Sequence, residues 1–177
     1  MKRTLRKYLP EPEEVLAKKW AAPFRPWLGH PNLWHLNRRS VPGAVAIGLF
    51  CGLIPGPVQM LSALAVAIPC RSNIPLAMMV TWYTNPFTIV PLYLGAYEVG
   101  RRVLGKDRGE GVNAIPEWDW SIADMWTWLL SLGKPLVVGI VVLATVLALA
   151  GYFLTRLAWR VYVVMAWRRR AARAVRP

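Results

Sequence analysis

The chain has 177 residues, of which 55% are hydrophobic and only 18% are charged, and its formal net charge is +13. Soluble domains average about 45–50% apolar and about 25% charged residues, so both values favour a membrane protein. The ten tryptophans of so apolar a chain argue against intrinsic disorder, and the hydrophobicity excludes a soluble module that only binds nucleic acid.

The first forty residues predict a basic, cytoplasmic segment that lies along the membrane surface. Residues 10–22 predict a short amphipathic helix, with three glutamates near its start and Lys18 and Lys19 near its end. Trp20, Trp27 and Trp34 recur every seven residues, as is typical of side chains at the level of the lipid headgroups. We expect no cleavable signal peptide, because no apolar run follows the basic start for more than thirty residues.

Residues 41–70 carry no charge and predict a re-entrant helical hairpin. As one straight helix they would be about 45 Å long, against a hydrocarbon core of about 30 Å. Pro55 and Pro57 flank Gly56 at the centre, and this arrangement breaks a helix. Each half is about 18 Å long and too short to cross alone. We therefore expect the chain to enter the membrane, turn and leave on the same side.

Residues 72–100 predict a second apolar segment, long enough to span the membrane with a kink at Thr84-Asn85-Pro86. Residues 101–134 predict an outer loop that is rich in tryptophan, with a helix over 121–132 at the outer leaflet. Trp118, Trp120, Trp126 and Trp128 form its expected aromatic belt.

Residues 135–155 are uncharged and predict an ordinary transmembrane helix. Residues 156–177 carry seven arginines and no acidic residue, and we expect this tail to continue the helix into the cytoplasm. Its arginines fit either a determinant of topology or a docking site for anionic lipid or ribosomal RNA.

The basic residues gather at the two ends of the chain, so both termini are predicted to be cytoplasmic. One re-entrant hairpin plus two spans satisfies this condition. Either broken segment fits the re-entrant role. Arg71 lies between them and favours 41–70 as the hairpin, because an arginine on the cytoplasmic side costs less free energy than one on the outer side. Three full spans are the alternative. Arg101 and Arg102 fall on the unfavourable side in the preferred topology.

The fold predicted is thus an all-α integral protein of the bacterial inner membrane: a re-entrant hairpin, two transmembrane helices and a short amphipathic N-terminal helix. The domains expected are 1–40 at the surface, 41–160 in the membrane and the tail 156–177.

No catalytic or metal-binding motif appears in the sequence. There is no phosphate loop, no nucleophile elbow and no zinc-protease motif. His30 and His35 are five residues apart with a proline between them, and they do not share a helix face. We expect no enzyme activity, no metal and no cofactor.

Polar residues beside the two predicted helix breaks are the candidate binding site. Freed backbone groups are tolerated there only inside protein or beside a water-filled cavity, and paired broken segments point to binding sites in transporters. Helix N-termini beside arginines suit an anionic headgroup or phosphate. The candidate ligand-binding residues are Arg38, Arg39, Gln59, Thr84, Asn85 and Thr88. Glu98 either pairs with Arg101 or Arg102 or acts as a proton-coupling carboxylate.

Several stretches together resemble a bacterial membrane-protein family, domain of unknown function 2062. They are His30 to Val41, Ala46 to Phe50, Ile54 to Met60, and Thr84 to Thr88 with Pro91. The resemblance implies a membrane location and supplies no catalytic residues. A hairpin followed by spans also resembles the layout of DedA-type lipid transporters, without the charged residues that those proteins carry within the hairpin.

Two functions are expected. One is a protein that transports or positions an anionic lipid or small solute at the broken helices, as a homo-oligomer. The other is a structural or assembly subunit of a larger membrane complex. The sequence does not favour nucleic acid as a partner, because no RNA-binding motif accompanies the arginines.

Overall fold

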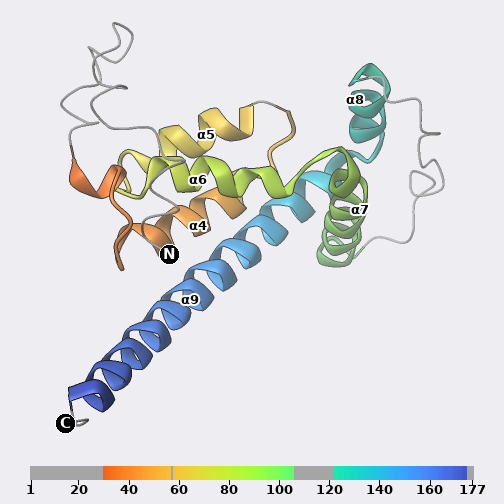
Figure 1. The fold of residues 1–177 in the computed structure, drawn as a ribbon. Helices are drawn as coiled ribbons and strands as arrows, with labels where there is room; N and C mark the ends of the chain where they lie inside the picture. Colours follow the sequence, from red (N-terminus) through yellow and green to blue (C-terminus); the bar gives the residue numbers. More distant parts are fainter. Residues whose placement is uncertain (1–29, 57, 106–121, 175–177) are drawn as a thin grey trace, which may run out of the picture. The chain divides into compact units, whose positions relative to one another are not determined.

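The computed structural model describes residues 30–56, 58–105 and 122–174. Every element in these ranges is a helix, which confirms the all-helical prediction (Figure 1). The predicted amphipathic helix over 10–22 lies outside them. The elements are η2 (Pro31–Leu33), α4 (Ser40–Cys51), α5 (Val58–Ala67), α6 (Ile74–Val80), η3 (Thr81–Tyr83), α7 (Pro86–Val103), α8 (Ile122–Ser131) and α9 (Gly133–Ala174).

The chain divides into two compact units. The first unit holds residues 1–81 and 148–177, and the second holds residues 82–147. Helix α9 begins in the second unit and continues past Ala148 into the first.

In the first unit, α4, α5 and α6 pack against one another around a core of small and aliphatic side chains (Figure 1). Four alanines and one cysteine let the three helices approach closely, since a small side chain keeps the backbones near one another. The fully or nearly buried members are Leu33, Ala44, Ile47, Cys51, Ala63, Ala67, Ile74 and Ala77.

The glycines of α4 allow its close contact with α6. A Cβ atom on Gly48 would lie 2.6 Å from the carbonyl oxygen of Ala77, and one on Gly43 would overlap the Ser72 hydroxyl. Gly48 thus lets α4 approach α6 itself, and Gly43 lets α4 approach the link that precedes α6.

The break between α4 and α5 lies at residues 52–57, where the prolines predicted it. Gly56 has a φ of 78°, a left-handed conformation that a residue without a side chain adopts freely. The break is thus encoded locally, and α4 and α5 have 12 and 10 residues.

A left-handed residue also ends α5. Arg71 has a φ of 48°, the N–H of Ser72 donates to the Ala67 carbonyl at 3.0 Å, and the N–H of Arg71 donates to the Ile68 carbonyl at 3.0 Å. This pattern is a Schellman cap, which usually places glycine where Arg71 stands. Asn73 then caps α6, since its side-chain oxygen accepts the N–H of Leu76 at 2.9 Å.

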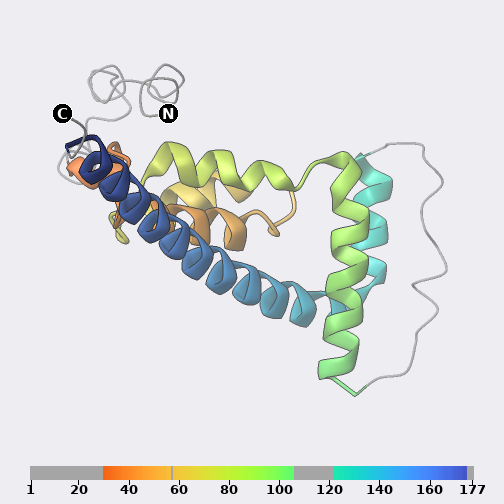
Figure 2. The same ribbon diagram turned by 60° about the horizontal axis from the view of Figure 1, so that its bottom comes forward.

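In the second unit, α7 and the start of α9 meet at two glycines (Figure 2). A Cβ atom on Gly139 would overlap the carbonyl oxygen of Ala96, and one on Gly100 would overlap that of Pro135. The helix predicted over 121–132 is α8. Its Trp128 was predicted to lie in an aromatic belt, but the side chain is only 6% exposed and packs inside the unit.

Helix α9 has 42 residues, about 63 Å of helix, and joins the predicted span to the arginine-rich tail without interruption. Within the described residues it is the one helix long and apolar enough to cross a membrane, over Gly133–Arg168. In its first-unit portion, Gly151 faces the side chains of Leu49 and Val45 on α4. The re-entrant hairpin and the two-span topology stay predictions.

Candidate functional site: an arginine groove

The loop before α4 is held by a set of short hydrogen bonds. The N–H of Asn32 donates to Nδ1 of His30 at 3.2 Å and opens η2. The side-chain nitrogen of Asn37 donates to Oδ1 of Asn32 at 2.8 Å, and the buried Ser40 hydroxyl donates to the His35 carbonyl at 2.7 Å. These bonds satisfy the polar groups of a segment that has no regular helix of its own, and they give the loop a defined shape.

Asn37 also fixes the backbone at the start of α4. Its side-chain oxygen accepts the backbone N–H of Arg39 and that of Ser40, both at 2.8 Å. The first N–H groups of a helix have no carbonyl partner within the helix, and Asn37 satisfies two of them. Beside this anchored helix start, Arg38 and Arg39 carry exposed side chains.

The facing wall belongs to the second half of α9. Arg156 and Arg160 are four residues apart, so they lie on one face of the helix, about 6 Å apart along its axis. Trp159 stands between them in sequence and is half-buried, and Tyr152 lies one turn before Arg156. Tryptophan and tyrosine have an apolar body and a polar edge, as suits the boundary between hydrocarbon and water.

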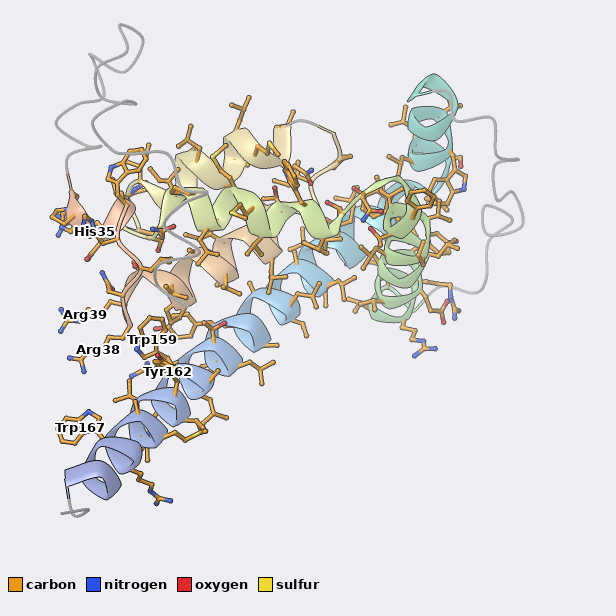
Figure 3. The ribbon with its side chains drawn as sticks, in the orientation of Figure 1. His35, Arg38, Arg39, Trp159, Tyr162 and Trp167 are labelled. Carbon is orange, nitrogen blue, oxygen red and sulfur yellow. The ribbon has the colours of Figure 1, made fainter. Side chains whose placement is uncertain are left out.

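Together the two walls enclose an open groove of about 740 Å³ within the first unit. Figure 3 shows the side chains of Arg38 and Arg39 next to Trp159. The lining residues are Arg38, Arg39, Tyr152, Phe153, Arg156, Leu157, Trp159, Arg160, Val163 and Val164. Four arginines and the apolar side chains of α9 thus line one groove.

No carboxylate neutralises this groove from the described part of its own unit. Residues 30–56, 58–81 and 148–174 contain no aspartate or glutamate. The ion pairs in the described ranges both involve Glu98, in the second unit. Guanidinium groups are strongly favoured where they meet phosphate or carboxylate oxygens, often with two parallel hydrogen bonds. The groove therefore presents a positive field that suits an anionic ligand.

The structure places the other predicted ligand residues in two settings. Gln59 lies in the first turn of α5 and, unlike Arg38 and Arg39, is not in the groove lining. Thr84, Asn85 and Thr88 lie in the second unit at the start of α7.

Asn85 and Thr88 form a capping box at that helix start. The Asn85 side-chain oxygen accepts the N–H groups of Phe87 and Thr88, and the Thr88 hydroxyl accepts the N–H of Asn85 at 2.9 Å. The same hydroxyl donates to the Tyr83 carbonyl at 2.6 Å. The box stabilises the helix start after the predicted break, and a ligand role for these side chains stays a prediction.

Glu98 forms ion pairs with Arg101 and Arg102, which was one of the two interpretations of this residue from the sequence. Its carboxylate lies 2.6 Å from Nη2 of Arg101 and 2.9 Å from Nε of Arg102. Arg101 is the better enclosed partner, with a side chain 18% exposed against 75% for Arg102. A role in proton coupling stays a prediction for a carboxylate held in this way.

Within the ranges that the structure describes, no cluster of three or more histidine, cysteine, aspartate or glutamate residues forms a metal site. Cys51 is buried and Cys70 is exposed, and both are free thiols.

Arg38 and Arg39 were predicted from the sequence as ligand-binding residues. Arg156 and Arg160 were predicted only as part of the arginine-rich tail 156–177, which was interpreted either as a determinant of topology or as a docking site for anionic lipid or ribosomal RNA. A usable signal was present, because two arginines spaced by four residues with a tryptophan between them follow directly after an uncharged stretch. No sequence pattern indicates that residues 38–39 fold against that part of α9.

The fold and groove define a class: an all-helical chain with one long apolar helix and a basic groove in its first unit. The chain belongs to the DUF2062 family of uncharacterized proteins conserved in bacteria, which it matches over residues 21–168. The match confirms the family resemblance and covers both walls of the groove. No curated protein and no solved structure shows significant similarity to the chain.

Proposed function

We propose that this chain is a multi-pass protein of the bacterial inner membrane that holds the phosphate headgroup of an anionic lipid in the arginine groove. The observation that carries the proposal is the position of four arginines around one groove, two of which, Arg156 and Arg160, follow an uncharged stretch of α9. The apolar stretch supplies the membrane anchor and the groove supplies the anion site.

Exposure along α9 supports the membrane location. Its most apolar window is only 17% buried, whereas the core helix of a soluble protein is mostly buried. Val141, Leu149 and Leu154, which do not line the groove, are all more than half exposed, and so long an apolar surface would be unfavourable in water. A hydrocarbon environment explains that surface.

The length of the uncharged stretch sets the depth of the groove. Residues 135–155 form about 31 Å of helix, which matches the thickness of the hydrocarbon core. Arg156 and Arg160 then emerge where the phosphates lie, together with Trp159. Arginine side chains near a membrane boundary extend toward the headgroups in this manner. A lipid phosphate is therefore the anion closest at hand for the groove.

The remaining helices fit the same topology. Helices α4 and α5 measure about 18 Å and 15 Å, each shorter than the hydrocarbon core, as a re-entrant hairpin requires. The second span in this proposal is the broken segment 72–100, which consists of α6, η3 and most of α7. Glu98 neutralises part of the charge of Arg101 and Arg102 at the end of that span, which eases their position away from the cytoplasm. Both termini are then cytoplasmic.

Titration of the purified protein with phosphatidylglycerol and phosphatidylcholine, followed by native mass spectrometry, tests the proposal. An arginine near an anionic membrane surface contributes about 1 kcal/mol to the binding free energy. Removing one arginine from each wall should therefore weaken the binding of anionic lipid tenfold or more. The variant is R38Q/R156Q. The control is R168Q, an exposed arginine two turns beyond Arg160 that does not line the groove.

The parent and R168Q should bind phosphatidylglycerol in preference to phosphatidylcholine, and R38Q/R156Q should lose that preference. Equal binding of the two lipids by the parent would contradict the proposal. So would tight binding of a short RNA that R38Q/R156Q abolishes while anionic lipid binding persists. A stoichiometric protein partner that occupies the groove in native membranes would instead favour an assembly subunit.

A further inference from the structure

We infer that the groove selects a lipid headgroup that carries two phosphates over one that carries a single phosphate. This inference rests on the proposed function and names the ligand class of the same site. Its basis is that the four arginines come as two pairs from different parts of the chain, Arg38 with Arg39 and Arg156 with Arg160.

The number of charges argues for more than one phosphate. A phosphodiester carries one negative charge, and one arginine can satisfy two of its oxygens with its planar fork of donors. Four guanidinium groups around a single phosphodiester would leave most of their charge unpaired. No carboxylate in the described residues of the unit offsets the excess.

The size of the groove argues in the same direction. Its volume of about 740 Å³ lies within the range of about 300–1,000 Å³ typical of pockets for whole small molecules. A single phosphate group is only a few times larger than a water molecule, which occupies about 30 Å³ in the liquid. The groove therefore accommodates two phosphates and the group that joins them.

The arrangement of the walls gives each phosphate its own pair of arginines. Arg156 and Arg160 project from successive turns of one helix face, about 6 Å apart along the axis. Arg38 and Arg39 are neighbours in the chain, and the backbone of Arg39 is anchored by Asn37. Trp159 and the aliphatic residues of α9 leave an apolar floor for the lipid part of the ligand. The occupant is thus a lipid with a bridged or joined diphosphate headgroup.

The test compares cardiolipin, whose headgroup holds two phosphates, with phosphatidylglycerol, which holds one. Both are added at equal phosphate concentration to the full-length protein in neutral detergent, and bound lipid is counted by native mass spectrometry. Inorganic pyrophosphate and orthophosphate serve as competitors, which distinguishes a lipid headgroup from a soluble phosphate. The variants are R38Q/R39Q and R156Q/R160Q, with R168Q as the control.

The parent and R168Q should bind the two-phosphate lipid at least tenfold more tightly than the one-phosphate lipid. Each double variant should reduce that ratio to less than threefold, because only one pair of arginines remains. R156K/R160K keeps the charge and removes the bidentate geometry, so it should retain binding of the one-phosphate lipid and lose most of the selectivity. Melting temperatures within two degrees of the parent establish that the variants fold.

A parent ratio below twofold, with anionic lipid still preferred over phosphatidylcholine, would overturn this inference and leave the proposed function standing. An effect confined to one of the two double variants would overturn it in the same way. Direct binding of pyrophosphate by the parent, with no binding of either lipid, would identify a soluble ligand and overturn both.

Discussion

Asn85 and Thr88 cap each other across the first turn of α7: the Asn85 side-chain oxygen accepts the Thr88 N–H at 3.1 Å, and the Thr88 hydroxyl accepts the Asn85 N–H at 2.9 Å. Replacing Asn85 by alanine should lower the stability of the protein by about 1 kcal/mol, the usual effect of losing a helix cap. The measurement is the melting temperature in detergent by circular dichroism.

Thr88→Ser keeps the hydroxyl and should retain most of the stability, as should Asn85→Asp, which keeps the accepting oxygen. Lipid binding should be unchanged in all of these variants. If Asn85→Ala instead kept its melting temperature and lost anionic lipid, the residue would be a ligand, as the sequence suggested.

Gly139 should tolerate no larger side chain. A Cβ atom there would overlap the Ala96 carbonyl, so Gly139→Ala must push α7 and α9 apart, at a cost of about 1–3 kcal/mol. Gly95, on α7, is the matched control, because a Cβ atom at that position would meet no other atom within 4 Å. Gly95→Ala should raise stability by about 0.5–1 kcal/mol, because alanine favours a helix more than glycine does. Equal effects of the two substitutions on thermal unfolding would contradict the close contact.

Cys70 reports on the topology of the hairpin without any engineered label site. It is exposed in the link after α5, while Cys51 is buried in α4. A re-entrant hairpin places Cys70 in the cytoplasm, so a membrane-impermeant maleimide should label it in inverted vesicles and leave it unlabelled in intact spheroplasts. Cys51→Ala should show the same pattern, and Cys70→Ala should abolish labelling. Labelling from the outer side would establish the alternative with three full spans.

Replacing Arg71 by glycine should stabilise the protein. Its φ of 48° costs a residue with a side chain about 1 kcal/mol, which glycine avoids. Arg71→Gly should therefore stabilise the protein by about 0.5–1 kcal/mol in a thermal melt. Arg71→Ala removes the charge and keeps the strain, so it should give no such gain. A gain of the same size in Arg71→Ala would attribute the effect to charge.

The helix breaks were predictable because their cause is local. Proline lacks the N–H that a helix needs, so Pro55 and Pro86 mark the end of α4 and the start of α7 directly in the sequence. The helix over 121–132 was also foreseen. By contrast, the contact of Gly48 with α6 depends on which helices become neighbours, and a glycine spacing alone does not specify its partner.

The groove was only half predictable for the same reason. Arg39 and Arg156 are more than a hundred residues apart, and no local sequence pattern predicts that they line one groove. The role of Asn37 was equally hidden, since the side chain that fixes the start of α4 stands outside the helix. The polar residues at the breaks drew attention because they are rare in apolar sequence, although Asn85 and Thr88 serve the backbone beside them.

Helix α9 continues past Thr155 without a break, so the apolar stretch and the two arginines beyond it belong to one helix. In the proposed topology, a bilayer that thickens or thins would shift this helix along its axis and carry Arg156 and Arg160 with it. Inserting one residue into the apolar stretch would displace them by about 1.5 Å and turn them by about 100°. In the proposed topology, membrane thickness would therefore set how well this wall meets the plane of the phosphates.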